Sequence, residues 1–555
     1  MQNESIQALE IIFLFFMVFI VVFGLLARKL KTPYPIIMVI GGLLLSFVPR
    51  IPKIGLNPDL VFFVILPPLL YSAAWQTSWR SFSRNLVSIF MLAVGLVTFT
   101  VLGVAQLAPL VLRGFDWRMG FLLGAAVATT DAIAATSIAR RLGLPRSIVD
   151  VLEGESLVND ASGLLALELG IAMLLQDKTP TVGFALARLA YLTLAGLAVG
   201  LLGGVIVHWI EDRIEDGPIE TAISILIPYA TYLVAEQIHA SGVLAVVAIG
   251  FYLSRESSHF FSANVRLQAW AVWETLEFVL NGLAFVLIGL QLPYVLQGIH
   301  DYSRTSLILY GAGFSAMVIL LRLIWIYPGA RFSYFIRQHI LHHKESVPSL
   351  RRMFVVGWTG MRGVIALAAA IALPQTLSNG TPFAQRNLII FLTFSVILVT
   401  LILQGLTLPK LIRSLGLAGV TESNEEEQAA RRVILESALS YLDEAREKDP
   451  DHFGIYDDLA QHTRHHLTTL SQDGDVGEDS NLGEYSRYVN VARGVIRNKR
   501  STAVRLRNEG KIDDALLRQI ERELDLNELR LDGGKRTGQL QESRRAFHDH
   551  SRNQL

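Results

Sequence analysis

The sequence of 555 residues contains no cysteine and carries little charge. Without cysteine the chain has no disulfide framework, no thiolate metal site and no cysteine nucleophile. Asp, Glu, Lys and Arg make up 18% of the residues, whereas soluble domains contain roughly 25%. The hydrophobic share is 52%, and the mean hydropathy is +0.41. This composition excludes an ordinary soluble protein and indicates an integral membrane protein.

Long apolar runs recur along most of the chain. A run of about 20 apolar residues is long enough to cross the hydrocarbon core as a helix. We therefore predict an all-α polytopic membrane protein with about thirteen spans, near residues 8–27, 34–49, 58–75, 86–112, 117–139, 148–176, 183–210, 218–237, 240–254, 267–294, 305–327, 352–373 and 387–412. The first run follows acidic residues rather than basic ones, which predicts a retained helix and not a cleaved signal peptide.

The charges are distributed unevenly along the chain. Residues 1–415 are mostly apolar, and residues 416–555 are charged with helical patterning. We predict a transmembrane domain over 1–415 and a helical, regulatory cytoplasmic tail over 416–555. Lys and Arg concentrate in one alternating set of connections, such as those near 28–31, 140–146 and 331–352, which places that set in the cytoplasm. With an odd number of spans, the N-terminus then lies outside and the tail inside.

The span near 148–176 carries several polar side chains in its first half. A charged side chain near the centre of a spanning helix costs roughly 2.5–3.5 kcal/mol, so these acids need partners or a task. At 3.6 residues per turn Glu153, Ser156 and Asp160 share one face, while Glu155 and Asn159 share the adjacent face. This helix therefore presents a hydroxyl beside a carboxylate.

Two other spans are interrupted by small residues and carry a charge. Asp131 follows Thr130 within a run of Ala, Gly and Thr, and Arg362 lies between Gly360 and Gly363. One such span in each half of a chain is typical of inverted-repeat transporters, whose broken helices cross near the midplane. We expect the fifth span to pair with the twelfth and the sixth with the thirteenth.

Buried Glu155 needs a cationic partner. Only Arg322, in the eleventh span, and Arg362 lie deep enough to supply one, and the sequence does not choose between them. The alternative for Arg322 is that its long side chain reaches the cytoplasmic surface.

In span seven Gly196, Gly200 and Gly204 repeat every four residues. This spacing predicts close helix packing, with a dimer face as one option.

Several of these motifs together resemble the sodium/proton exchanger superfamily, which includes bacterial NhaP-type antiporters and animal NHE exchangers. The resemblance covers about residues 8–415. The motifs are Thr130-Asp131, Glu155-Ser156 with Asn159-Asp160, Gly360-Met-Arg-Gly363, Pro67-Pro68-Leu-Leu and His239-Ala-Ser-Gly-Val-Leu-Ala. The chain departs from the pattern at Ala132, where many relatives have Pro, and at Tyr71-Ser72, where many have an acid.

The resemblance implies both an activity and a site. It implies Na⁺ bound at Asp131, Ser156 and Asp160, with Thr130 as a further oxygen ligand. It also implies that Asn159 occupies the place of an Asp found in electrogenic relatives, and that Glu155 forms a buried ion pair with an arginine. Spans 4–6 and 11–13 would form the core, and spans 1–3 and 7–10 the scaffold and dimer part. The implied protein is a homodimeric antiporter of the inner (plasma) membrane, not an enzyme, without cofactor or nucleic-acid partner.

A mechanism follows from the chemistry of these groups. Na⁺, Li⁺ and K⁺ are hard cations that bind oxygen ligands. Partial desolvation favours the neutral form of a carboxylic acid, so one carboxylate can hold a proton or a cation in turn. We assign this role to Asp160 and, because Asn159 is neutral, expect electroneutral 1:1 exchange that serves pH and sodium homeostasis.

Two other functions use the same residues. Asp131 and Asp160 could share a proton as an intramembrane aspartyl-protease dyad, but their Thr-Asp and Asn-Asp contexts differ from those of such proteases. A cation channel needs a continuous pore, commonly lined by a symmetric ring of groups, whereas the polar groups here converge on one asymmetric cluster.

Overall fold

The computed structural model describes residues 2–48, 55–176, 181–214, 216–260, 263–299, 302–342, 349–377, 380–419, 424–449, 453–471 and 481–509, with short stretches up to 528. The regular elements in these ranges are helices, and an isolated bridge joins Thr376 to Pro382.

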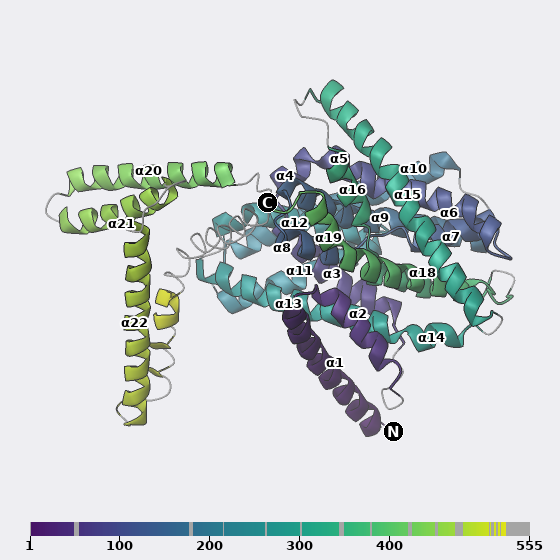
Figure 1. The fold of residues 1–555 in the computed structure, drawn as a ribbon, viewed down its shortest axis with the longest axis horizontal. Coiled ribbons are helices and arrows are strands. Elements are labelled where there is room, and N and C mark those ends of the chain that lie inside the picture. The colour runs from purple at the N-terminus through teal and green to yellow at the C-terminus, as the bar shows by residue number, and fades with distance from the viewer. Residues whose placement is uncertain are drawn as a thin grey trace. The chain divides into compact units, whose positions relative to one another are not determined.

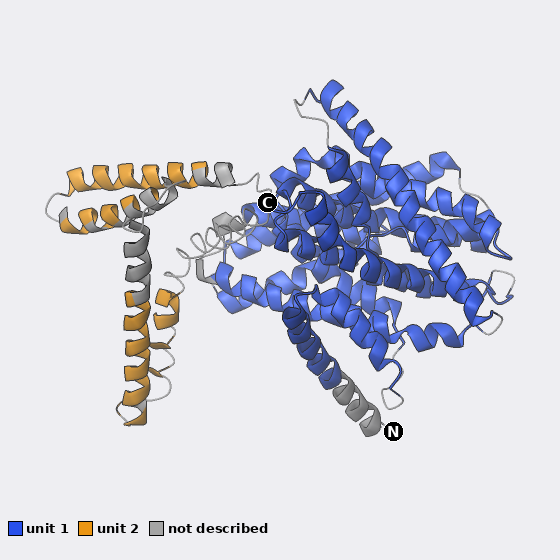
Figure 2. Ribbon diagram, in the orientation of Figure 1, with its two compact units in different colours: residues 1–422 blue, residues 423–555 orange. Residues whose placement is uncertain are grey.

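The chain divides into two compact units, Met1–Glu422 and Ser423–Leu555, which Figure 2 colours separately. The second unit contains α20 (Asn424–Lys448), α21 (Phe453–Ser471) and α22 (Asn481–Asn508), and α20 packs against α21. A regulatory role for this part stays a prediction.

The first unit is a bundle of packed helices (Figure 1). Three short segments, η1, η2 and η3, are π-helical turns that continue into α-helices. The elements are α1 (Gln2–Leu30), α2 (Tyr34–Leu45), η1 (Leu60–Ile65), α3 (Leu66–Gln76), α4 (Trp79–Arg84), α5 (Leu86–Phe90), η2 (Met91–Leu96), α6 (Val97–Val111), α7 (Trp117–Ala126), α8 (Ile133–Arg141), α9 (Arg146–Gln176), α10 (Val182–Glu211), α11 (Gly217–Gln237), α12 (Gly242–Phe260), α13 (Ala263–Leu290), α14 (Leu292–Gln297), α15 (Arg304–His339), α16 (Leu350–Trp358), α17 (Val364–Ile371), α18 (Arg386–Val399), η3 (Thr400–Gln404) and α19 (Gly405–Ser414).

The length and surface of these helices fit a membrane. Among the described residues, eight helices are long and apolar enough to cross a bilayer. Large apolar side chains such as Phe13, Leu194 and Ile308 are exposed on α1, α10 and α15, where lipid rather than water would cover them. The prediction of an all-α polytopic membrane protein is confirmed. The number of thirteen spans stays a prediction.

Two helical segments are interrupted in the middle. Residues 127–132 separate α7 from α8, and residues 359–363 separate α16 from α17. The backbone N–H of Asp131 donates to the carbonyl of Met361 at 2.8 Å, so the two interruptions touch. The freed backbone groups therefore bond to protein, as apolar surroundings require.

The glycine stripe of α10 lies against α12 of the same chain. Gly196, Gly200 and Gly204 are buried, and a Cβ on Gly196 would lie 2.7 Å from the carbonyl oxygen of Ser241. A Cβ on Gly204 would lie 2.5 Å from the ring of Tyr252. These three glycines therefore serve close packing of α10 against α12. Because α12 covers them, they cannot also contact a second copy of the chain.

We expect Gly200→Val to destabilise the membrane unit. Its Cβ would lie 2.7 Å from the Cβ of Ala248, and overpacking of this kind costs about 1–3 kcal/mol. The measurement is the thermal unfolding midpoint of the purified protein in one detergent. Gly183→Val, on the exposed start of the same helix with nothing within 4 Å of its Cβ, is the control and should unfold at the wild-type temperature. Equal midpoints for both variants would contradict this packing.

Candidate ion-binding site

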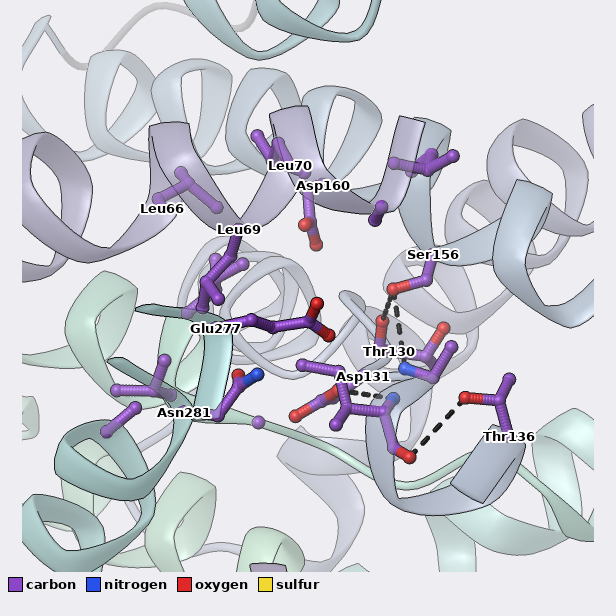
Figure 3. Close-up of a pocket in the computed structure, with 18 of the residues that line it drawn as sticks. Leu66, Leu69, Leu70, Thr130, Asp131, Thr136, Ser156, Asp160, Glu277 and Asn281 are labelled. Atoms are coloured by element: carbon purple, nitrogen blue, oxygen red, sulfur yellow. Dashed lines mark hydrogen bonds between the residues drawn. The ribbon is translucent and has the colours of Figure 1, made fainter. Parts of the chain in front are cut away.

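A cavity of about 330 Å³ lies between the interrupted helices and their neighbours (Figure 3). Its walls come from η1, α3, the 127–132 interruption, α8, α9, α13 and the start of α17. The polar residues that line it are Tyr34, Gln76, Thr129, Thr130, Asp131, Thr136, Ser137, Arg140, Glu153, Ser156, Asp160, Glu277 and Asn281.

Asp131 lies in the first interruption, directly before α8. Its Oδ1 accepts a hydrogen bond of 2.8 Å from the N–H of Ile133, which satisfies a free donor at the start of that helix. A Cβ on Gly363 would lie 2.6 Å from Oδ2 of Asp131. The second interruption therefore approaches this carboxylate so closely that only glycine fits there.

Ser156 of α9 holds the unwound backbone beside Asp131. Its hydroxyl donates to the carbonyl of Thr130 at 3.0 Å and accepts from the N–H of Ala132 at 3.4 Å. The chain is non-helical here although Ala132 replaces the proline of many relatives. Hydrogen bonds from α9 therefore support the interruption without the stiffening that proline supplies.

Asp160 lies one turn beyond Ser156 and is 3% exposed. Its Oδ1 is buried and accepts no hydrogen bond from any described group, and the same holds for Oδ1 of Asn159. A buried oxygen without a donor is unfavourable unless a proton or a cation satisfies it. Oδ1 of Asp160 is therefore a candidate ligand, whereas Asn159 is not among the residues that line the cavity. Asp131, Ser156 and Asp160 line this one cavity, as the sequence predicts.

Thr130 is engaged on both sides. Its hydroxyl donates to Oε1 of Glu155 at 3.0 Å and accepts from Nδ2 of Asn159. Since these contacts use its proton and one lone pair, Thr130 links the cavity wall to the buried Glu155.

The partner of Glu155 is Arg322 of α15. Nη1 of Arg322 donates to Oε1 of Glu155, and Nη2 donates to Oε2 at 2.8 Å; both side chains are 2% exposed. Arg322 also donates to the carbonyls of Val356 and Gly357 near the end of α16. It thus joins α9, α15 and α16 and does not reach the surface.

Arg362 does not pair with Glu155. The prediction that Arg362 could be the partner of Glu155 is therefore wrong. Nη1 of Arg362 donates to the carbonyls of Ala128 and Thr129 at 2.9 and 3.1 Å, and the backbone N–H of Arg362 donates to the hydroxyl of Thr400. Its cation therefore faces the free carbonyls just beyond α7, where the helix dipole favours positive charge.

Sequence reasoning missed Glu277 and Asn281, which line the cavity from α13. Glu277 lies in an apolar span, so the argument that selected Asp131 would also have selected it. Three further acids line the cavity. Glu153 pairs with Arg140 at 2.6 Å, whereas Asp160 and Asp131 have no cationic partner among the described side chains.

The cavity thus contains more carboxylates than cations. Asp131, Glu153, Asp160 and Glu277 line it together with a single arginine, Arg140. A cleft lined by negative charge between apolar walls raises the local concentration of cations. A polytopic membrane protein with such a site between touching interrupted helices has the architecture of a secondary cation transporter.

Comparisons with known proteins agree with this class. A family model described as the transmembrane sodium/hydrogen exchanger matches residues 15–413. The chain belongs to this family.

The relatives include an uncharacterised Na⁺/H⁺ exchanger of Mycobacterium tuberculosis, 31% identical over 92% of this chain and 94% of that protein. The Na⁺/H⁺ antiporter ApNhaP of Aphanothece halophytica is 32% identical over 74% of this chain and 75% of its own. The structure of the sodium proton antiporter MjNhaP1 from Methanocaldococcus jannaschii matches with a TM-score of 0.57 at 20% identity, covering 73% of this chain and 99% of that chain. The structural match supports the fold.

We expect Arg322→Met to destabilise the protein strongly, because it leaves Glu155 buried without its cation. Breaking one side of a buried pair costs about 3–5 kcal/mol. Removing the partly exposed Arg140 by Arg140→Met, the control, should cost at most about 1 kcal/mol. Thermal unfolding midpoints in detergent measure the difference. The double variant Glu155→Gln/Arg322→Met should recover part of the loss, and a double variant less stable than Arg322→Met would argue against the pair.

Proposed function

We propose that this protein exchanges Na⁺, or alternatively Li⁺ or K⁺, for H⁺ across the plasma membrane. The observation that carries the proposal is the buried, donor-free Oδ1 of Asp160 in a cavity that Asp131 and Ser156 also line. The names of relatives support the cargo: one from Bacillus pumilus, 32% identical over 75% of this chain, is called a sodium, potassium, lithium and rubidium/H⁺ antiporter.

In this proposal the cation and the proton compete for Asp160. The cation binds oxygens of Asp160, Asp131 and Ser156, and Thr130 and Asn159 fix the wall beside them. A proton on Asp160 removes the negative charge that holds the cation, so the two cargoes exclude each other. If the site crosses the membrane loaded and never empty, an inward proton gradient expels the cation.

We also propose an architecture that lets the ion site open alternately to the two sides of the membrane. Thirteen segments span the membrane as inverted repeats, with the interrupted α7–α8 and α16–α17 crossing at the site. The core of spans 4–6 and 11–13 moves against a scaffold of spans 1–3 and 7–10, which also forms a homodimer. We further propose that this end of the cavity faces the cytoplasm and that the N-terminus lies outside; the positive charges of Arg140 and Arg141 in the sequence support this orientation.

The transported ions are the only small partners this mechanism needs, and we propose no cofactor. Half-buried Asp131 and buried Asp160 line one cavity, but Asp131 accepts a hydrogen bond from the N–H of Ile133, while Oδ1 of Asp160 accepts none from the described residues. In an aspartyl-protease dyad the two carboxylates share one proton in similar surroundings. The different surroundings of Asp131 and Asp160 therefore favour a cation-binding site over such a dyad.

We expect Asp160→Asn to abolish exchange, because the amide can neither release a proton nor balance the charge of a cation. The measurement is Na⁺-driven collapse of a pH gradient in proteoliposomes that contain the purified protein. Asp150→Asn makes the same chemical change on the same helix at a residue outside the cavity lining, and it should retain the wild-type rate. Exchange at the wild-type rate in Asp160→Asn would refute the proposed site.

We expect the exchange rate to be insensitive to membrane voltage. If one net charge crossed per cycle, 100 mV would be worth about 2.3 kcal/mol, which is roughly a 50-fold effect on a rate-limiting charge-moving step. Electroneutral 1:1 exchange should change less than about twofold when a potassium diffusion potential of that size is imposed with valinomycin, using a cation other than K⁺ as cargo. A current carried by the purified protein under a Na⁺ gradient would exclude this stoichiometry.

A further inference from the structure

Glu277 contributes a carboxylate to the cavity from a different helix than Asp131 and Asp160. It belongs to α13, which packs against α2, α3 and η1, whereas the two aspartates belong to the α7–α8 interruption and α9. Figure 3 shows the Glu277 side chain extending into the cavity toward Asp131 and Ser156. Asn281 follows one turn later on the same face of α13 and also lines the cavity.

Two neutral side chains of α3 fix the orientation of Glu277. Its Oε2 accepts hydrogen bonds from the hydroxyl of Ser72 at 3.0 Å and from Nε2 of Gln76 at 2.9 Å. Gln76 also donates to Ser72 at 3.0 Å, so the three groups form a closed cluster. The carboxylate is therefore held in place without a cation.

The other glutamates near the cavity are neutralised by protein. Glu153 pairs with Arg140, and Glu155 pairs with Arg322. Glu277 forms no ion pair with any Lys, Arg or His side chain in the described part of the chain. Its negative charge is thus left for a mobile cation.

A cation held only by the core wall would be poorly coordinated. Hard cations take about six or more oxygens, and Asp131, Ser156 and Asp160 supply only part of that number. Oδ1 of Asp131 already accepts from Ile133, and the Ser156 hydroxyl already makes two hydrogen bonds. A carboxylate from α13 adds ligands and charge without any change to the core.

We propose that Glu277 is a cation-binding and affinity-determining residue: it receives an alkali cation from the cavity and shares it with Asp160. This inference rests on the proposed exchange function. In the architecture proposed above, α13 and α3 belong to the scaffold, so Glu277 does not move with the core. Glu277 therefore sets the apparent affinity for the cation on the cavity side, and Asp160 carries out the exchange.

The test is the Na⁺ dependence of exchange by the full-length protein in proteoliposomes. Glu277→Gln should raise the half-saturating Na⁺ concentration on the cavity side by about tenfold, and this rise should exceed the fall in maximal rate. Glu274→Gln, three residues earlier on the same helix and exposed, is the matched control and should leave both values unchanged.

A second variant guards against misfolding. Ser72→Glu/Glu277→Ser moves the carboxylate across the 3.0 Å contact from α13 to α3 and should restore the half-saturating concentration to within about threefold of wild type. Unaltered Na⁺ dependence in Glu277→Gln would overturn the inference, and so would a folded double variant with no gain over Glu277→Gln. If the wild-type protein itself showed no Na⁺-driven proton movement, the proposed function would fail instead.

Discussion

The structure depends on one constraint: backbone groups freed by an interrupted helix within the membrane must find partners inside the protein. The two interruptions meet this requirement largely through each other. The N–H of Asp131 bonds to the carbonyl of Met361, and Arg362 bonds to the carbonyls of Ala128 and Thr129. Ser156 of α9 and Thr400 of η3 complete the set. The two interrupted segments, residues 127–132 and 359–363, thus stabilise each other through hydrogen bonds, and the ion site forms beside them.

Charge is arranged around this junction in two layers. In the buried layer Glu155 and Arg322 neutralise each other and connect α9 to α15 and α16. In the cavity layer the acids outnumber the single arginine, so the cavity attracts cations. Thr130 connects the layers, since its backbone lies in the interruption and its hydroxyl binds Glu155. A change in the Glu155–Arg322 pair should therefore alter the position of Thr130 at the ion site.

The site residues that could be predicted from the sequence are the charged ones, because burying a charge in a membrane is costly. Asp131, Glu155 and Asp160 stood out because charged residues are rare in spanning helices, and periodicity placed Ser156 beside Asp160. Periodicity within one helix says nothing about which helices are neighbours, so it could not choose between Arg322 and Arg362. The cost of burying a charge applies to Glu277 as well, but it was missed because its span was taken as scaffold. Its hydrogen bonds to Ser72 and Gln76, about 200 residues away, could not be predicted from periodicity.

The size of the cavity has a consequence for how an ion gives up its hydration shell. About 330 Å³ is room for on the order of ten water molecules. An arriving ion can therefore keep most of its bound water until it reaches the carboxylates. The ion then loses its bound water only at the last step of entry, so discrimination between small and large alkali ions is confined to the innermost oxygens.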